Sequence, residues 1–350
     1  MFKIKLNRSH VAFSTKSLFH ILLIAFLFIA CNKREKRSQL VHLIGNAQGT
    51  TYSIKYFDSI NRDYQPQIDS IIEAVDLSMS TYIPNSIISK INSNIRVKTD
   101  TLFREVFYKS VEIWQQTDSI FDPTVGALVN AWGFGPGEKI EMDSLKVDSI
   151  LKFTGLDKVS LRPDGYIKKE FKDTYLDFNA IAQGFTVDLV ARFFESKKVE
   201  NYLVEIGGEI RAGGKNLSNN FDWLVAIDHP QQTENGGLIA TLKLKNMALA
   251  TSGNYRKFFI DTLTGERYVH TINPKTGYPQ RSNVLSASVL AAQCMDADGY
   301  ATVFMASDLE KSKKILDSLA SKMDAYILYL DENGNLQKYI TPGFKSYLID

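Results

Sequence analysis

The sequence predicts an α+β protein, and three observations lead to this prediction. Helical periodicity marks the front and the middle of the chain, whereas strand-like alternation clusters between residues 202 and 291. The chain has 350 residues, of which 44% are hydrophobic. Helices and clustered strands in separate stretches are typical of α+β architecture. A chain of this length can bury a core as one large domain or as two smaller ones.

The charge pattern excludes one class of function. The formal net charge is +2, and the basic residues are scattered along the chain instead of gathering on one helix or arm. Proteins that bind nucleic acid concentrate basic residues on the contacting surface. We therefore expect no nucleic-acid partner.

The first thirty residues form an export signal. Basic residues precede an apolar run from Ile21 to Ala30, which is too short to span a bilayer comfortably and has the length of a signal-peptide core. The run ends at Ala30-Cys31 and is followed by a polar stretch. This arrangement resembles a bacterial lipoprotein cleavage site, with Cys31 as the lipidated residue. An ordinary cleaved signal and an uncleaved anchor are the alternatives.

These features divide the chain into three predicted segments. Residues 1–30 are the signal peptide, residues 31–43 are the lipidated cysteine and a polar tether, and residues 44–350 are the folded domain. Cys294 is the only other cysteine, so lipidation of Cys31 leaves no partner for a disulfide. We expect Cys294 to be a small buried hydrophobe, because a nucleophile would need an activating base. The protein is expected to be exported, anchored to a bacterial membrane by lipid, and facing the periplasm.

Periodicity predicts the elements of the front half. Ordered structure is expected to begin near residue 41, and alternation predicts a strand over 50–56. Apolar residues recur at helical spacing from Ile68 to Met79, which predicts an amphipathic helix. A loop at Pro84, a short segment over 87–92 and a second helix over 102–116 follow.

Two glycine-containing segments come next, at 121–126 and 132–137. The second combines three glycines, a proline and two aromatic residues within six positions. Such a loop has a backbone suited to close approach to a flat or bulky group. Packing of an ordinary turn against the core is an equally good interpretation.

The segment 175–194 is predicted to be a strand, a turn and a helix. Residues 175–178 alternate as a strand does, 179–184 are small or polar, and apolar residues from Phe185 to Phe194 have helical spacing. The start of such a helix presents unpaired N–H groups, which suit an anion. Neither GxGxxG nor GKS/GKT is present here, so a nucleotide site would be of another kind.

The second half is predicted to be rich in strands. Strands are expected over 202–206, 223–228, 238–244, 285–291 and 326–330, and strands ending in polar turns are expected near 248–256 and 268–277. Helices are expected over 295–306 and 309–319.

The helix over 295–306 holds a candidate metal site. Asp298 and Thr302 lie four residues apart, so their side chains project from the same face of a helix. Magnesium takes oxygen ligands, and its coordination is usually completed by substrate phosphates and water. A polar stripe on a surface helix is the alternative explanation of the spacing.

His270 is the best candidate for a general base. It ends a predicted strand beside the turn at 273–277, and imidazole is the side chain most often used for proton transfer. A solvated or core histidine is the alternative. The absence of a CxxC pattern argues against a zinc site.

Taken together, the loops resemble those of the ApbE family of FAD:protein FMN transferases, and the likeness covers nearly all of the exported part. Each block is weak alone, but all occur in the order found in the family. The blocks are QGTTY at 48–52, STYIPNS at 80–86, FDPTVG at 121–126 with WGFG at 132–135, LDFNAIAQG at 176–184, IGG at 206–208, ATSGNY at 250–255, HTINPKTG at 270–277 and ADGYAT at 297–302.

The resemblance implies a T-fold-like single catalytic domain of mixed and antiparallel sheets with flanking helices. It implies Mg²⁺ as cofactor and FAD as substrate, with FMN transferred through a phosphoester bond to a Ser or Thr hydroxyl and AMP released. Asp298, Thr302 and the main-chain carbonyl of Ala180 match the metal ligands, and His270 matches the residue that activates the acceptor hydroxyl. The positions that match FAD contacts are Gln48, Tyr82, Ile120, Phe121, Asp122, Asp177, Gln183 and Ile272.

Two positions depart from the family pattern. Gln48 stands where Met is usual, and Gln183 stands where Lys or another charged residue is usual. The implied partners are flavin-accepting subunits of membrane redox complexes, such as the sodium-pumping quinone reductase. An FAD pyrophosphatase that gives FMN and AMP, and a lipid-anchored FAD-binding protein without catalysis, are the competing hypotheses.

Overall fold

An eight-stranded sheet organises the chain, and each neighbouring pair of its strands is antiparallel. The computed structural model describes residues 38–228, 237–253, 258–260, 267–269, 271–279, 282–320 and 322–349. In spatial order, the strands are β1 (Gln39–Ala47), β2 (Thr50–Asp58), β5 (Tyr202–Ile206), β6 (Glu209–Gly213), β9 (Met247–Gly253), β12 (Val284–Ala291), β13 (Met323–Leu330) and β14 (Leu336–Ile340).

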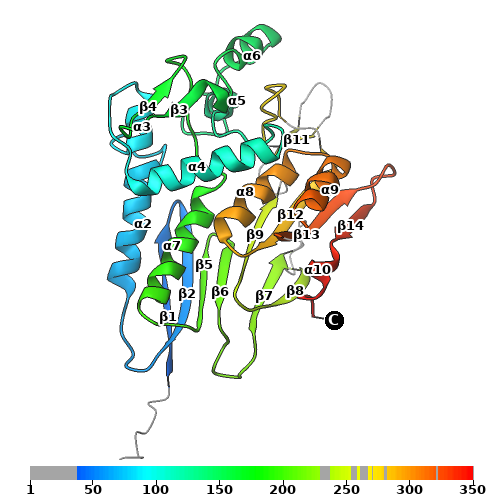
Figure 1. Ribbon diagram of the computed structural model, residues 1–350. Coiled ribbons are helices and arrows are strands. Elements are labelled where there is room, and N and C mark those ends of the chain that lie inside the picture. Colours follow the sequence, from blue (N-terminus) through cyan, green and yellow to red (C-terminus); the bar gives the residue numbers. More distant parts are fainter. Residues whose placement is uncertain are drawn as a thin grey trace, which may run out of the picture. The chain divides into compact units, whose positions relative to one another are not determined.

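Helices and three small hairpins surround this sheet (Figure 1). The helices are α2 (Gln65–Met79), α3 (Ile87–Asn92), α4 (Thr101–Gln116), α5 (Gly126–Trp132), α6 (Ser144–Leu151), α7 (Ala182–Ser196), α8 (Cys294–Met305), α9 (Leu309–Ser318) and α10 (Pro342–Lys345), with a 3₁₀ turn at Leu156–Lys158. The hairpins are β3 (Val159–Leu161) with β4 (Ile167–Lys169), β7 (Trp223–Asp228) with β8 (Leu238–Leu244), and β10 (Phe258–Ile260) with β11 (Arg267–Val269). The α+β prediction is therefore confirmed.

The sheet has a different cover on each face. Helices α7 and α8 cross one face, as Figure 1 shows, and α2 lies beside α7. The β7–β8 hairpin and α10 contribute Trp223, Leu244 and Phe344 to the core on the other face. Because successive side chains of a strand point to opposite faces, β5 sends Val204 to the helical side and Leu203 to the hairpin side.

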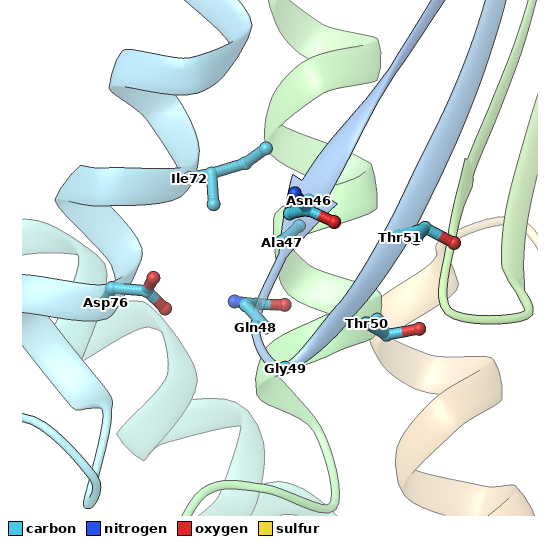
Figure 2. Close-up of a pocket in the computed structure, with 8 residues that line it drawn as sticks. All are labelled: Asn46, Ala47, Gln48, Gly49, Thr50, Thr51, Ile72 and Asp76. Atoms are coloured by element: carbon cyan, nitrogen blue, oxygen red, sulfur yellow. The ribbon is translucent and has the colours of Figure 1, made fainter.

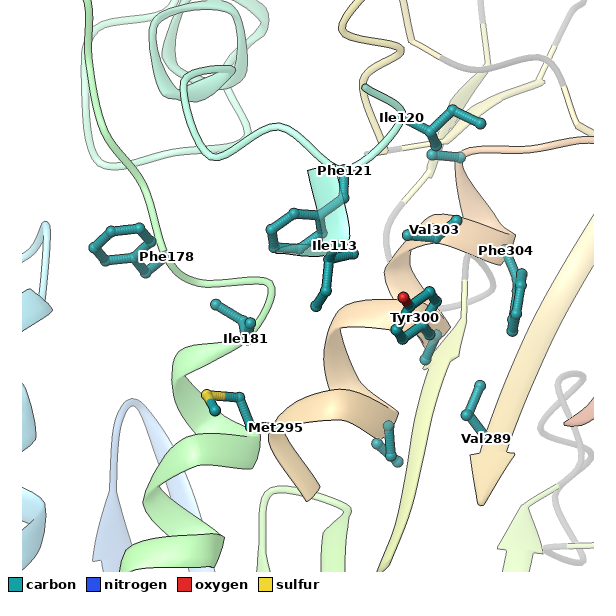
Figure 3. Close-up of a cluster of buried hydrophobic side chains, with 14 of the residues drawn as sticks. Ile113, Ile120, Phe121, Phe178, Ile181, Val289, Met295, Tyr300, Val303 and Phe304 are labelled. Atoms are coloured by element: carbon teal, nitrogen blue, oxygen red, sulfur yellow. The ribbon is translucent and has the colours of Figure 1, made fainter. Parts of the chain in front are cut away.

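Helix α8 is buried on nearly all sides. Only Asp296 and Thr302 among its residues are not buried, and Figure 3 shows Met295, Tyr300 and Phe304 within the hydrophobic cluster. A helix that is apolar all round belongs in a core. The alternative of a polar stripe on a surface helix is therefore wrong.

The predicted strand over 175–178 is not formed. The backbone N–H and C=O of Leu176 both pair with the side chain of Asn92, at 2.8 Å each, and the N–H of Asp177 donates to Pro123 O at 2.7 Å. Tyr175 makes only an isolated bridge to Val125. The Asn92 side-chain amide thus takes the backbone hydrogen bonds that a neighbouring strand would make, so alternation alone does not produce a strand here.

The front of the domain begins earlier than predicted. Strand β1 starts at Gln39 and pairs with β2 along its whole length, so the strand includes the last residues that we assigned to the tether. Within the described ranges, no helix is both long and apolar enough to cross a membrane.

Candidate functional site

A cavity of about 940 Å³ opens where α2, the start of α7, α8 and the loop after α4 converge. Every described residue that the sequence predicts to bind FAD or metal lines this cavity. These are Gln48, Tyr82, Ile120, Phe121, Asp122, Asp177, Ala180, Gln183, Ile272, Asp298 and Thr302. His270 and Cys31 lie outside the described residues, so their roles stay predictions.

Asp298 lies at the meeting point of α7 and α8. Its side chain is buried, and its Oδ2 accepts a hydrogen bond from the Gly184 N–H at 2.9 Å. Burial raises the pKa of Asp298 to about 7, and the negative charge of Asp188 adds to the rise. The helix start that was predicted to bind an anion therefore binds a carboxylate of the protein itself.

Gly184 allows α7 and α8 to approach closely. A Cβ atom at this position would lie 2.5 Å from the Cys294 carbonyl oxygen and 2.7 Å from the Asp298 Cβ. Such contacts are too short for any side chain. Glycine is therefore required for the packing that brings Asp298 to the start of α7.

A buried ion pair fixes the beginning of α8. Helix α8 has no side-chain cap of its own. Instead, Asp188 of α7 accepts hydrogen bonds from the N–H groups of Cys294 at 3.0 Å and Met295 at 2.9 Å. Arg211 of β6 donates to Asp188 at 2.6 Å and to Glu195 at 3.2 Å. Because Asp298 follows one turn after these N–H groups, this capping sets its position.

Two further residues that carry candidate oxygen ligands, Ala180 and Thr302, line the same cavity. Thr302 follows Asp298 by one helical turn and lines the cavity. Ala180 lies just before α7. Among the described turns, loops and caps, no backbone N–H donates to its carbonyl oxygen. A carboxylate, a hydroxyl and a carbonyl make the all-oxygen set that Mg²⁺ prefers. The residues present therefore fit such a cation.

Not every predicted contact is free for a ligand. Asp122 is buried, and its carboxylate accepts from the Thr124 N–H and hydroxyl, the Leu156 N–H and the Trp114 indole. Asp177 accepts from the backbone and side chain of Asn179. These acids shape the cavity wall through their hydrogen bonds.

Gln48 lines the main cavity and a smaller one of about 460 Å³ (Figure 2). It sits in the β1–β2 turn with a φ of 50°, and its Nε2 donates to the Thr186 hydroxyl at 2.8 Å. Its Oε1 is buried without a hydrogen-bond partner. The departure from Met thus leaves an unpaired acceptor oxygen beside the cavity, and the amide nitrogen of Gln48 is the atom on the side of Asp76 (Figure 2).

The described lining of the cavity is acidic. It contains Asp76, Asp122, Asp177, Glu209 and Asp298, and it contains no Lys or Arg. Gln183, where the family usually has a charged residue, donates to Ile206 O at 2.8 Å. No group of three His, Cys, Asp or Glu side chains is placed to hold a metal within the described ranges. A metal here would therefore use the hydroxyl and carbonyl oxygens as well.

Sequence reasoning assigned no role to several residues of the lining, among them Asp76, Glu209 and Phe134. Glu209 lines the cavity from the start of β6, directly after the Gly207-Gly208 turn, and Phe134 lines it from the loop after α5. The glycine pair was a signal for the turn, but nothing in the sequence indicated that the residue after it faces α8. The loop at 132–137 packs through Trp132, whose Nε1 donates to Gly277 O at 2.9 Å. It lines the cavity through Phe134.

Comparisons with known proteins agree with this geometry. The model of the ApbE family matches residues 48–327. A protein from Haemophilus influenzae named FAD:protein FMN transferase is 34% identical over 90% of this chain and 92% of its own length. A protein of the same name from Vibrio cholerae is 34% identical over 90% and 94%.

Solved structures agree as well. The flavin transferase ApbE from Vibrio cholerae superposes with a TM-score of 0.79 at 32% identity, covering 89% of this chain and all of that one. The apo form of the flavinyl transferase ApbE from Pseudomonas stutzeri gives a TM-score of 0.79 at 27% identity, covering 89% and 97%. The chain therefore belongs to the ApbE family, as the order of its sequence blocks predicts.

Proposed function

We propose that this enzyme transfers FMN from FAD to a Ser or Thr hydroxyl of a partner protein and releases AMP, with Mg²⁺ as cofactor. The names of the relatives support flavin transfer from FAD to protein. The acidic lining of the cavity supports the need for a divalent cation. Each phosphate of FAD is negative, so a cavity with acids and no described Lys or Arg would repel it unless a cation intervenes.

Different residues of the cavity would bind the cation and the substrate. Asp298, Thr302 and the Ala180 carbonyl would hold the cation, which when bound polarises the phosphoryl oxygens and neutralises charge on the leaving group. Gln48 and Gln183 offer amide groups to the substrate. Tyr82 is 62% exposed and lines the cavity, so its ring is placed at the rim, where FAD would enter.

The bond changes balance without any other reactant. The acceptor oxygen forms a bond to the phosphorus of the FMN half, and the bond from that phosphorus to the AMP phosphate breaks. The hydroxyl proton passes to His270, in the role that the family pattern gives to this residue. AMP leaves with the electron pair of the broken bond.

We also propose that the enzyme acts outside the cytoplasm, at a membrane surface. The signal-like segment 1–30 and Cys31 support an exported, lipid-anchored enzyme that faces the periplasm. Flavin-accepting subunits of membrane redox complexes, of the sodium-pumping quinone reductase type, would then be within its reach.

Incubation of the full-length chain in detergent with FAD, Mg²⁺ and a flavin-accepting subunit tests the proposal. We expect a fluorescent acceptor band after denaturing electrophoresis, one AMP for each labelled acceptor, and no band after treatment with EDTA. AMP released equally without acceptor would identify a pyrophosphatase. FAD recovered intact after long incubation would identify a binding protein without catalysis.

The raised pKa of Asp298 predicts a pH dependence of metal binding. Below pH 7 a cation must displace the proton that burial retains on this group, so the affinity for Mg²⁺ should fall by about tenfold or more for each pH unit. Above pH 7 it should change much less. Calorimetric titration with Mg²⁺ between pH 5.5 and 8.5 checks this, and equal affinity at pH 5.5 and 7.5 would contradict it.

A further inference from the structure

Glu209 faces the cavity because of its place in the sheet. It is the first residue of β6 and lies opposite Ile206 of β5, across the turn Gly207-Gly208, whose φ values are 61° and 109°. Two positive φ values fit a tight hairpin turn and fix the register. Ile210 packs on the hairpin side of the sheet, so Glu209 points to the helical side, where α8 lies.

One oxygen of the Glu209 carboxylate, Oε2, is buried without a partner. An orphaned buried acceptor is costly. Burial, and after it the negative charge of Asp298, raises the pKa of Glu209 well above its usual range. The nearest cation on the same strand face, Arg211, is engaged by Asp188 and Glu195.

We propose that Glu209 provides a second carboxylate for the divalent cation held by Asp298. This inference rests on the metal dependence in the proposed function and adds a ligand that the sequence blocks did not contain. Two carboxylates, one hydroxyl and one carbonyl leave about two of the six positions of Mg²⁺ for phosphate oxygens or water. The same cation also removes the repulsion between the two acids.

Metal binding by the full-length chain in detergent tests the inference directly. Mn²⁺ affinity is measured by electron paramagnetic resonance, and unfolding temperature is measured with and without Mg²⁺, for wild type, Glu209→Gln and Glu205→Gln. Glu205 is the matched control, because it is on the adjacent strand and its Oε1 accepts from the Gly208 N–H at 2.8 Å. It does not line the cavity.

Glu209→Gln should weaken Mn²⁺ binding roughly 10- to 100-fold, and the stabilisation by Mg²⁺ should shrink accordingly. Without metal, its unfolding temperature should equal or exceed that of wild type, because one of two repelling acids is gone. Glu205→Gln should bind Mn²⁺ as wild type does.

Three other results are informative. Unchanged Mn²⁺ affinity in Glu209→Gln, with binding abolished in Asp298→Ala, would overturn the role of Glu209 and leave the proposed function intact. Equal Mn²⁺ binding by wild type and Asp298→Ala would instead overturn the role of Asp298 as a metal ligand, and with it the site to which Glu209 is assigned. A lower metal-free unfolding temperature in Glu209→Gln, with unchanged Mn²⁺ affinity, would make the residue structural and also overturn the inference.

Discussion

Asp298→Asn should lower the rate of flavin transfer by about 1,000-fold or more. An amide cannot supply the negative charge that binds Mg²⁺ tightly, and Lewis-acid assistance by a metal is worth several kcal/mol, with each 1.36 kcal/mol equal to about tenfold in rate. Asparagine retains an oxygen that can accept the hydrogen bond from the Gly184 N–H. The fold should therefore survive. Fluorescence of the labelled acceptor over time gives the rate.

The stability of the metal-free protein should depend on pH, and Asp298→Asn tests this dependence. The pKa of Asp298 in the folded protein, about 7, lies above its ordinary value of 3.8. The folded state therefore holds this proton more tightly, and the free energy of unfolding falls as pH rises from about 4 to about 7. The fall should be on the order of a few kcal/mol in wild type and smaller in Asp298→Asn.

Asp296→Asn is the matched control for both measurements. Asp296 lies on the same helix and pairs with Lys109 at 2.9 Å, but it does not line the cavity. Its transfer rate should stay within about twofold of wild type, because partly exposed ion pairs contribute little. A transfer rate of Asp298→Asn equal to that of this control would rule out Asp298 as a metal ligand.

The cavity could be predicted from the sequence because its residues lie in loops with distinctive composition. The blocks around Asp177, Ala180 and Asp298 can be recognised in the sequence, and the structure brings them to one cavity. Glu209 was missed because its direction depends on the register of β5 and β6, which pairing across the sheet determines. Asp188 was missed because it caps a helix more than a hundred positions away.

The fold was predictable where a local pattern matched the tertiary environment. Helix α4 has an apolar face of helical period and β12 is a short apolar run, and both lie within one residue of the predicted bounds. The strand at 175–178 failed because Asn92, a distant side chain, takes the hydrogen bonds of Leu176. Helices α5 and α6 were overlooked because each is short, and short helices carry too few turns to establish a period.

Asp188→Ala should destabilise the protein by about 3–5 kcal/mol, the usual cost of removing one partner from a buried ion pair. The change would leave Arg211 without its buried partner and would leave the N–H groups of Cys294 and Met295 without acceptors. Urea unfolding measures the loss as a lower midpoint with an unchanged slope. Because the start of α8 would no longer be fixed, Mg²⁺ affinity should fall as well.

Glu195→Gln separates this effect from a general loss of charge around Arg211. Glu195 also accepts from Arg211, at 3.2 Å, but its side chain is 49% exposed, so its loss should cost less than about 1 kcal/mol. Asp188→Asn, which keeps one of the two acceptor oxygens for α8 and loses the charge, should fall between the two and provides a folded variant if alanine unfolds the chain. If Asp188→Asn and Glu195→Gln were equally stable and bound Mg²⁺ equally well, the buried pair would not be what positions α8.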